Sequence, residues 1–216
     1  MKKDKILNEI VSNAIELMSF KTIKDNYSEF EKALKFISDE LKDYYVKEYI
    51  VNNYKNLVIS NTKEKDLDVI FCCHVDVVPA EKYEGILKND KLYGRGSFDM
   101  KGQLSVVMSL LKNNKSSKKV ALIVTSDEEI GMIGAGKLDM SVLKGRRMVN
   151  IDAEEDDTVI VSCAGGCDFN IKLPLSYIPV SGGMVTVEFK GRQVNMKSIM
   201  GVMSLGIPTQ SEVVIS

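Results

Sequence analysis

The only histidine of the chain, His74, ends an apolar run and stands two residues before Asp76. In an extended strand residues i and i+2 lie on the same face, so Asp76 can accept a hydrogen bond from one ring nitrogen of His74. The other ring nitrogen is then free for a cation. The pair predicts half of a metal site, but it is a weak signal alone, because a single histidine on an apolar face is more often a core residue.

Acidic residues also follow two other apolar runs. The run at 120–125 is followed by the acidic segment 127–129, and the run at 148–151 ends at Asp152. Asp152 is the favoured ligand of its segment because it comes first, whereas the two glutamates that follow it are interpreted as surface residues.

A further carboxylate, Asp99, lies in the glycine-punctuated segment Tyr-Gly-Arg-Gly-Ser-Phe-Asp-Met-Lys-Gly at 93–102, directly before a predicted helix. The glycines allow backbone angles that other residues resist, so the loop can hold Asp99 at a helix N-terminus. A phosphate-binding loop is rejected, because the dinucleotide fingerprint needs a third glycine after a strand and the P-loop needs Gly-Lys-Ser/Thr.

These segments can bring five carboxylates and one imidazole to the same place. Carboxylates that share a cleft repel one another and lose hydration, which forces some of them to become protonated unless cations are present. Imidazole with carboxylates favours zinc, with cobalt or manganese as substitutes, over an all-oxygen calcium or magnesium site. The candidate residues are His74, Asp76, Asp99, Glu128, Glu129 and Asp152.

The order of the predicted elements explains how these residues could meet. Strands separated by helices predict an α/β fold, a three-layer αβα sandwich with a mostly parallel central sheet, in which ligands bind beyond the carboxyl ends of the strands. The segment Ser28-Glu29-Phe30-Glu31 has the form of a capping box at the start of a helix. We expect helices at 3–20, from Ser28 to Leu41 and at 104–111, and strands at 45–51, 56–60, 67–73, 119–125 and 147–151.

The C-terminal part of the chain is predicted to differ from the rest. We divide the chain into a catalytic domain at 1–165 and, at 166–216, a fragment of a smaller α+β lid domain or a degenerate segment. Alternating or apolar patterns predict extended segments at 157–163, 169–173, 184–189 and 212–215.

Composition argues against several classes of protein. The chain has 216 residues, of which 44% are hydrophobic and 27% charged, and its formal net charge of -1 offers no basic field for nucleic acid. The amphipathic amino terminus lacks the apolar core of a signal peptide and no run could cross a membrane, so a cytoplasmic location is expected. The four cysteines are interpreted as free thiols, with a disulfide or thiolate zinc site at Cys163 and Cys167 as the less favoured alternative.

In combination the motifs resemble those of the co-catalytic zinc exopeptidases, which include acetylornithine deacetylase, succinyl-diaminopimelate desuccinylase, tripeptide aminopeptidase and the Xaa-His dipeptidases. The resemblance spans roughly residues 6–190 and rests on four ordered motifs: His74-x-Asp76, the loop 94–102, Asp127-Glu128-Glu129 and Asp152. The segment 150–152 together with Ser-Cys-Ala-Gly-Gly at 162–166 is most similar to the Xaa-His dipeptidase branch.

The resemblance implies a metal-binding role for four residues. His74 and Asp152 would bind one zinc ion, Glu129 would bind the second, and Asp99 would bridge both. The family also has a cis peptide bond after the bridging aspartate, which we expect between Asp99 and Met100.

The resemblance also implies the chemistry. Glu128 would be the general base that takes a proton from the attacking water, and Asp76 would orient His74. The implied activity is that of a metallopeptidase, a dipeptidase or aminopeptidase that hydrolyses an amide bond in a small peptide. N-acyl amino acid deacylation is the alternative within the same chemistry. A catalytically inactive remnant with a binding or oligomerisation role is the alternative outside it.

Two histidines that the family normally has are missing. One would bind the second metal near the carboxyl terminus, and the other would bind the substrate carbonyl from the lid, but His74 is the only histidine. We therefore expect a truncated or lid-deleted chain whose second metal site lacks a ligand, so that one zinc ion could be bound where the full site binds two. Met196, Met200 and Met203 recur at helical spacing and could pack in a core or in a homodimer interface.

Overall fold

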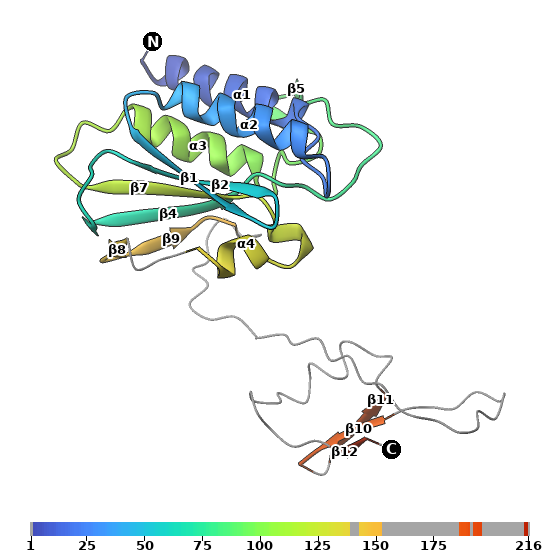
Figure 1. Cartoon of the computed structure of the whole chain (residues 1–216). Helices are drawn as coiled ribbons and strands as arrows, with labels where there is room; N and C mark the ends of the chain where they lie inside the picture. Colours follow the sequence, from blue (N-terminus) through green and yellow to red (C-terminus); the bar gives the residue numbers. More distant parts are fainter. Residues whose placement is uncertain (1, 139–142, 153–185, 191, 196–213, 216) are drawn as a thin grey trace. The chain divides into compact units, whose positions relative to one another are not determined.

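The computed structural model describes residues 2–138, 143–152, 186–190, 192–195 and 214–215. The chain divides into two units, Met1–Asp157 and Thr158–Ser216 (Figure 1). The division falls a few residues before the boundary predicted at 165, and the predicted lid fragment stays a prediction.

The first unit is built on a five-stranded sheet in the order β1-β2-β7-β4-β9. The hairpin of β1 (Tyr45–Val51) and β2 (Tyr54–Ser60) adds to β7 in antiparallel fashion, while β7 (Val120–Thr125), β4 (Val69–His74) and β9 (Met148–Asn150) run parallel to one another. The α/β class and the parallel centre predicted from the sequence are thus confirmed. β7 is buried along its whole length, as expected for a strand covered on both faces.

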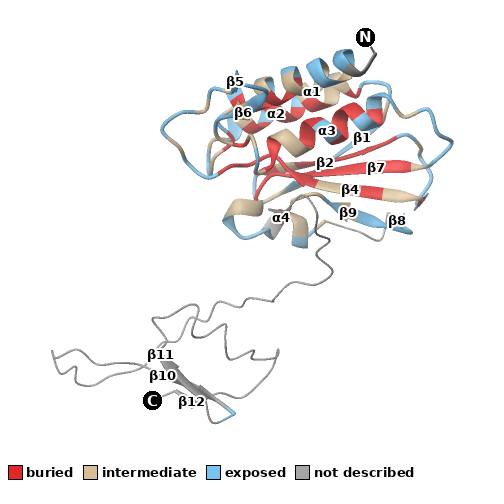
Figure 2. Ribbon diagram, turned by 180° about the vertical axis from the view of Figure 1, so that it is seen from behind, coloured by how far each residue is buried: buried red, intermediate tan, exposed pale blue. Residues whose placement is uncertain are grey.

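Three helices cover one face of this sheet (Figure 1). They are α1 (Lys2–Ser19), α2 (Tyr27–Glu40) and α3 (Lys101–Lys112), and each turns an apolar stripe toward the strands. The resulting core includes Leu17, Leu34, Leu104 and Leu122, all at most 2% exposed. Figure 2 shows this burial along β7, β4 and the inner faces of the helices.

The opposite face of the sheet carries a smaller apolar cluster. Val58, Ile70 and Ile123 pack there with Leu138 and Leu143. The helix α4 (Ile133–Gly136), a single turn, lies on that side (Figure 1). Two residues each of β3 (Asp66–Leu67) and β8 (Lys144–Gly145) pair in parallel beside the sheet.

The capping box predicted at Ser28 is wrong. The helix begins one residue earlier, at Tyr27, with Asn26 at the N-cap position and no side-chain capping hydrogen bond. Glu31, the predicted partner of the box, instead forms an ion pair with Lys55 at 2.8 Å. The cross-element contact competes with the local one, and the local pattern alone does not reveal it.

A second hairpin escaped the sequence analysis. β5 (Ile86–Lys88) and β6 (Lys91–Tyr93) are joined by Asn89 and Asp90, which have φ angles of 51° and 58°. Asparagine and aspartate tolerate the left-handed region, so this dipeptide is a recognisable two-residue turn. The same device, Asn52-Asn53, closes the β1–β2 hairpin.

The described part of the second unit is an antiparallel sheet in the order β11-β10-β12. It comprises β10 (Thr186–Phe189), β11 (Arg192–Asn195) and β12 (Val214–Ile215). β10 and β12 agree with the strands predicted at 184–189 and 212–215, whereas β11 was not predicted. The extended segments predicted at 157–163 and 169–173 lie outside the described residues.

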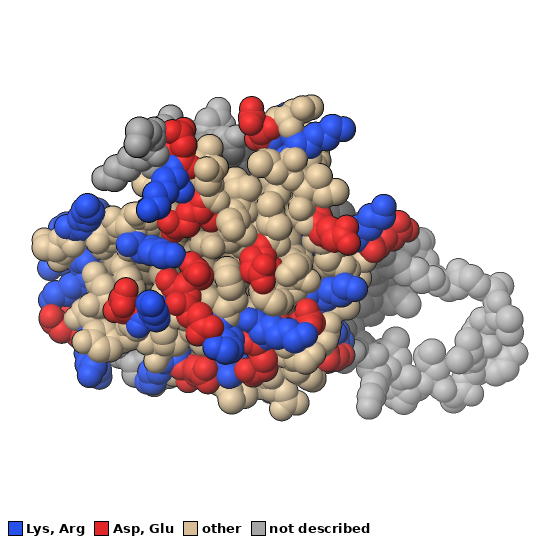
Figure 3. Space-filling model, turned by 90° about the horizontal axis from the view of Figure 1, so that it is seen from above, with Lys and Arg blue, Asp and Glu red and all other residues tan. Residues whose placement is uncertain are grey.

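The surface of the first unit carries charges of both signs. Figure 3 shows lysines and arginines interspersed with aspartates and glutamates on the face seen from above. Ion pairs such as Lys35–Asp39 and Lys112–Glu40, both 2.7 Å long, contribute to this pattern. In the described portion of the chain, no helix has both the length and the apolar character needed to span a bilayer.

Burial should make the thiols of β4 slow to react. Cys72 and Cys73 are free cysteines, and burial raises the pKa of each thiol. We expect iodoacetamide at pH 8 to alkylate Cys73, which is 2% exposed, on the order of 100-fold more slowly in the folded protein than in guanidinium. Peptide mapping by mass spectrometry measures this, with the less buried Cys72 as internal comparison. Equal rates for Cys73 in both states would contradict the burial described here.

Candidate metal centre

The ends of three parallel strands bring the predicted site residues to one level of the sheet. In the strand pairing His74 lies beside Thr125, and Cys72 lies beside Asn150. The acidic segment after β7 therefore begins next to His74, and Asp152, two residues beyond Asn150, reaches the same level. This is the convergence expected at the carboxyl edge of a parallel sheet.

Three carboxylates surround one nitrogen of the buried His74 ring. His74 Nε2 lies 3.0 Å from Asp99 Oδ1, 3.6 Å from Asp152 Oδ2 and 4.0 Å from Glu128 Oε2. The imidazole is 2% exposed, whereas the Asp99, Glu128 and Asp152 side chains are 47%, 34% and 27% exposed. The structure thus places an inaccessible imidazole at the base of a ring of carboxylates that solvent can reach.

The other nitrogen of the ring is fixed by the residue predicted to orient it. His74 Nδ1 lies 3.0 Å from the backbone carbonyl oxygen of Asp76 and 3.4 Å from its carboxylate Oδ1. The expected partner is therefore present, but its main-chain oxygen is the nearer acceptor. Asp76 Oδ2 accepts a hydrogen bond of 2.9 Å from the backbone N–H of Glu129. Asp76 consequently ties the end of β4 to the turn that carries both glutamates.

That turn is shaped by Asp127, whose contribution the sequence analysis missed. A 3-10 turn, η1 (Glu128–Ile130), follows β7, and the buried Asp127 precedes it at the N-cap position. The Asp127 carboxylate accepts a hydrogen bond from Gly134 N–H, and its carbonyl accepts one from Met132 N–H. The Asp127 side chain makes no capping hydrogen bond to η1 itself and bonds instead to Gly134 in the following turn, α4. The sequence analysis interpreted Asp127 only as part of a motif.

Asp99 is delivered by the glycine loop before α3. Gly94 and Gly96 have φ angles of 133° and 84°, which residues with a side chain rarely adopt. The peptide bond between Asp99 and Met100 is cis, as the resemblance implied. Met100 is fully buried, and its sulfur accepts a hydrogen bond from the backbone N–H of His74.

Several carboxylates lie close together around the His74 imidazole, and their proximity shifts the pKa values of the site residues. Burial raises the pKa values of Glu128, Glu129 and Asp152, and the negative charges of neighbouring carboxylates add to the effect. For Glu129 the charge of Asp99 comes next after burial. Burial lowers the pKa of His74, but the hydrogen bond to Asp76 and the surrounding negative charges outweigh it and raise the pKa to about 9.

The donor set fits a divalent cation. Ligands about 2.1 Å from a tetrahedral zinc ion lie about 3.4 Å from one another, which is close to the separations measured around His74 Nε2. Ligand atoms of His74, Glu128 and Asp152 lie within 4.8 Å of one another in the described part of the chain. Asp99, the predicted bridging ligand, and Glu129, the predicted second-metal ligand, are outside that group, whereas Glu128, the predicted base, is inside it. A cation would also neutralise the carboxylates whose pKa values are raised.

Metal binding should therefore release protons. A metal ligand must be deprotonated, and the raised pKa of His74 means that the metal-free imidazole carries a proton at pH 7. We expect the apparent zinc affinity to rise roughly tenfold per pH unit up to about pH 9, where the proton is lost without metal. Calorimetric titration in buffers of different ionisation enthalpy counts the released protons. An affinity that is constant between pH 6.5 and 8.5 would contradict this arrangement.

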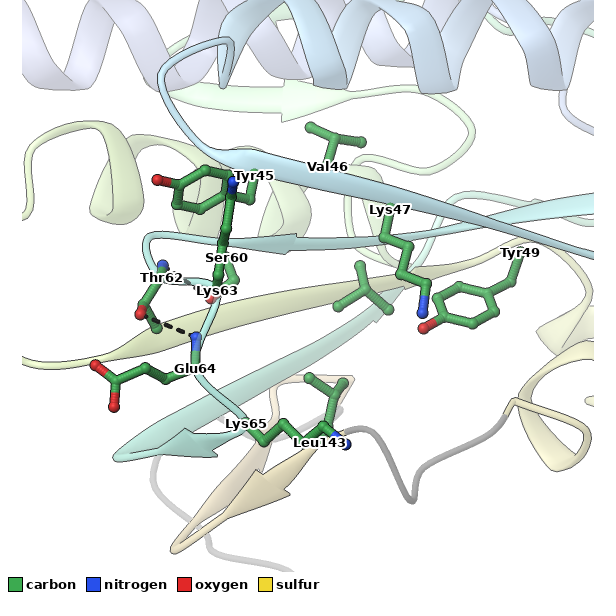
Figure 4. Close-up of a pocket in the computed structure, with 11 residues that line it drawn as sticks. Tyr45, Val46, Lys47, Tyr49, Ser60, Thr62, Lys63, Glu64, Lys65 and Leu143 are labelled. Atoms are coloured by element: carbon green, nitrogen blue, oxygen red, sulfur yellow. Dashed lines mark hydrogen bonds between the residues drawn. The ribbon is translucent and has the colours of Figure 1, made fainter.

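Two other features lie apart from this centre. A hollow of about 290 Å³ next to β1 is lined by residues that include Tyr45, Tyr49, Lys63 and Leu143, and none of the predicted site residues faces it (Figure 4). Arg95, in the glycine loop, forms no ion pair with the described residues, and its buried Nε has no hydrogen-bond partner among them. Neither feature contributes to the proposed chemistry.

The chain is similar to known proteins in sequence and in fold. The family model described as "Peptidase family M20/M25/M40" matches residues 70–183, just over half of the chain. A succinyl-diaminopimelate desuccinylase of Nautilia profundicola is 28% identical over 141 residues, which cover 62% of this chain and 38% of that protein. The chain thus spans well under half the length of this relative.

Solved structures show the same fold. Human carnosine dipeptidase 1 has a TM-score of 0.59 at 18% identity, covering 69% of this chain and 39% of its own. A tripeptidase from Staphylococcus aureus has a TM-score of 0.58 at 22% identity, covering 69% of this chain and 44% of its own.

The C-terminal segment matches a model of a different protein family. A second family model, described as "PTS HPr component phosphorylation site", matches residues 181–216, so that residues 181–183 belong to both matched regions. The sequence analysis did not detect this similarity. It offers another source for the segment that was interpreted as a partial lid or a degenerate end.

Proposed function

Because the chain belongs to peptidase family M20/M25/M40, we propose that its function is the metal-dependent hydrolysis of an amide bond in dipeptides or small peptides. The observation that carries the proposal is the convergence of Asp99, Glu128 and Asp152 within 4.0 Å of His74 Nε2. The dipeptidase and tripeptidase among the structural neighbours support the substrate class.

Each residue then has a distinct task. His74, Asp99 and Asp152 would hold a zinc ion, for which cobalt or manganese could substitute, and Asp76 keeps the imidazole ring in orientation. Glu129 and Asp99 would hold a second ion, as the resemblance implies; the negative charge of Asp99 raises the pKa of Glu129, and a cation there would offset that repulsion. Bound divalent ions lower the pKa of a coordinated water and polarise the scissile carbonyl.

Glu128 would act as the general base. Its carboxylate is one-third exposed and lies at the rim of the site, 4.0 Å from His74 Nε2, where a water molecule can approach it. Burial raises its pKa, which makes the carboxylate a stronger base than a solvated glutamate. It would accept a proton from the attacking water and return that proton to the leaving amine.

Two alternatives have observations of their own. The desuccinylase among the relatives favours hydrolysis of an N-acyl amino acid, which needs the same metal chemistry with a different substrate pocket. The absence of a second histidine favours an inactive remnant that keeps the fold.

A substrate panel distinguishes the three functions. The full chain, loaded with zinc or cobalt, is incubated with dipeptides, tripeptides, N-succinyl and N-acetyl amino acids, and released amines are measured. Turnover of peptides supports the proposal, turnover of acyl amino acids alone supports the deacylase, and a metal-loaded chain that cleaves nothing supports the remnant.

A further inference from the structure

Lys101 is a fully buried lysine beside the candidate metal centre that takes no part in the chemistry described above. It is the first residue of α3 and stands two residues after Asp99. Its side chain is among the largest fully buried ones in the described residues, with 0% exposure. Lysine is seldom buried to this degree, because its amine must give up hydration for whatever partner the protein supplies.

The partner is a main-chain carbonyl beyond the end of another helix. Lys101 Nζ donates a hydrogen bond of 2.6 Å to the carbonyl oxygen of Phe20, the residue after α1. The same oxygen accepts a hydrogen bond from the backbone N–H of Thr22 at 2.9 Å. The lysine and the segment after α1 therefore meet on one acceptor.

Thr22 continues the connection to the end of β4. Its hydroxyl donates to the carbonyl oxygen of Val75 at 2.6 Å, and its own carbonyl accepts from Val77 N–H at 3.0 Å. These two bonds flank Asp76. The segment 75–77, which holds the His74 ring, is thus connected through Thr22 to the Phe20 carbonyl that accepts the hydrogen bond from Lys101.

The lysine stem also fits against the glycine loop. A Cβ atom placed on Gly96 would lie 3.0 Å from Lys101 Cδ and 3.2 Å from Val77 Cγ1. The stem thus passes through a space that exists because residue 96 has no side chain. Gly96 also accepts a hydrogen bond from Gly102 N–H at 3.0 Å, which closes the loop that delivers Asp99.

We propose that Lys101 is a positioning residue that holds the Asp99 loop and the His74–Asp76 segment in fixed register, so that the two sides of the cation site meet. The inference rests on the proposed metal site and adds to it a structural support that touches no metal, substrate or reacting atom. The physical reason is that Lys101 connects the glycine loop to the Phe20 carbonyl, and Thr22, which donates to that carbonyl, is bonded to Val75 and Val77. A site of this kind needs its ligands held to within about 0.5 Å.

The single histidine provides a direct test. In protein labelled with 15N-histidine, the ring gives one set of NMR signals, which is recorded without metal and so does not depend on turnover. Lys101→Met keeps most of the stem and removes the donor. Lys112→Met is the matched control, because it removes a lysine from the same helix that pairs with Glu40 and Glu9 on the surface.

We expect Lys101→Met to shift the His74 ring signals, to lower Co²⁺ affinity about 10- to 100-fold and to change the Co²⁺ absorption spectrum, while Lys112→Met changes none of these. A folded Lys101→Met protein with unchanged ring signals and an unchanged Co²⁺ spectrum would overturn the proposal. If the wild-type chain binds no Co²⁺, the proposed function fails, but the ring signals still decide the role of Lys101.

A second variant decides the question if Lys101→Met does not fold. Thr22→Val has nearly the same shape and removes only the hydroxyl that donates to the Val75 carbonyl, while the backbone N–H that donates to Phe20 stays. The proposal expects Thr22→Val to shift the His74 ring signals away from their wild-type positions. Ring signals identical to those of the wild type would overturn it.

Discussion

Replacing His74 with asparagine is expected to lower zinc affinity on the order of 100-fold or more, with little change in the fold. The Asn amide can occupy the position of Nδ1 and keep the hydrogen bond to the Asp76 carbonyl, which is 3.0 Å long in the protein. It cannot replace Nε2, the atom around which Asp99, Glu128 and Asp152 gather. The variant thus removes the metal ligand and retains the hydrogen bond to the Asp76 carbonyl.

The measurement is a competition titration with a zinc indicator, and circular dichroism before and after metal removal checks the fold. Because the chain has no other histidine, the remaining affinity reports on carboxylates alone. An H74N protein that keeps the wild-type affinity would show that the cation, if any, is bound elsewhere.

Glu128→Gln should abolish turnover while leaving metal binding nearly intact. An amide cannot accept the proton of the attacking water, so the rate is expected to fall roughly 10²- to 10⁴-fold. The Glu128 carboxylate is the most distant of the three oxygens around His74 Nε2, at 4.0 Å, so its loss should cost the cation less than the loss of Asp99 or Asp152. Initial rates on the best substrate of the panel, together with the metal content per chain, measure both effects.

Asp43→Asn is a suitable control for the change in charge. Asp43 is exposed and precedes β1, whose Tyr45 pairs with Ser60, which in turn pairs with Ala121 near the start of β7. This is the end of the sheet opposite the metal centre. The Asp43→Asn protein should therefore keep the wild-type hydrolysis rate. A Glu128→Gln protein with a near wild-type rate would show that another residue is the general base.

The central sheet could be predicted because short sequence patterns indicate where each of its parallel strands ends. Each of the three parallel strands is an apolar run that ends in a polar residue, and parallel strands share one carboxyl edge. His74, Asp152 and the segment after β7 therefore had to approach one another whatever the connections between them.

What the sequence did not reveal depends on contacts between elements. Lys101 looks like a surface residue at a helix start until the packing of Phe20 and Gly96 around it is known. Glu31 looks like part of a capping box until Lys55 is seen opposite it. The turn at Asn89-Asp90 is different, because its local signal was present and could have been used.

The roles of Glu128 and Glu129 were assigned by resemblance, and adjacent acidic residues are hard to separate in any other way. The structure groups Glu128 with His74 and Asp152, while the backbone N–H of Glu129 is bonded to Asp76. The assignment of base and ligand within this pair therefore remains a prediction, and the Glu128→Gln experiment is the one that decides it.

The pairing of β4 with β7 and β9 has a consequence for the folding equilibrium of the first unit. The cation-binding atoms come together only after strands from three separate stretches of chain have aligned in the correct register, so an unfolded chain offers no comparable site. Any ion that occupies the site selects the native state, and the free energy of unfolding should then increase with the logarithm of the free ion concentration. The ion that takes part in amide hydrolysis would therefore also stabilise the first unit against thermal unfolding.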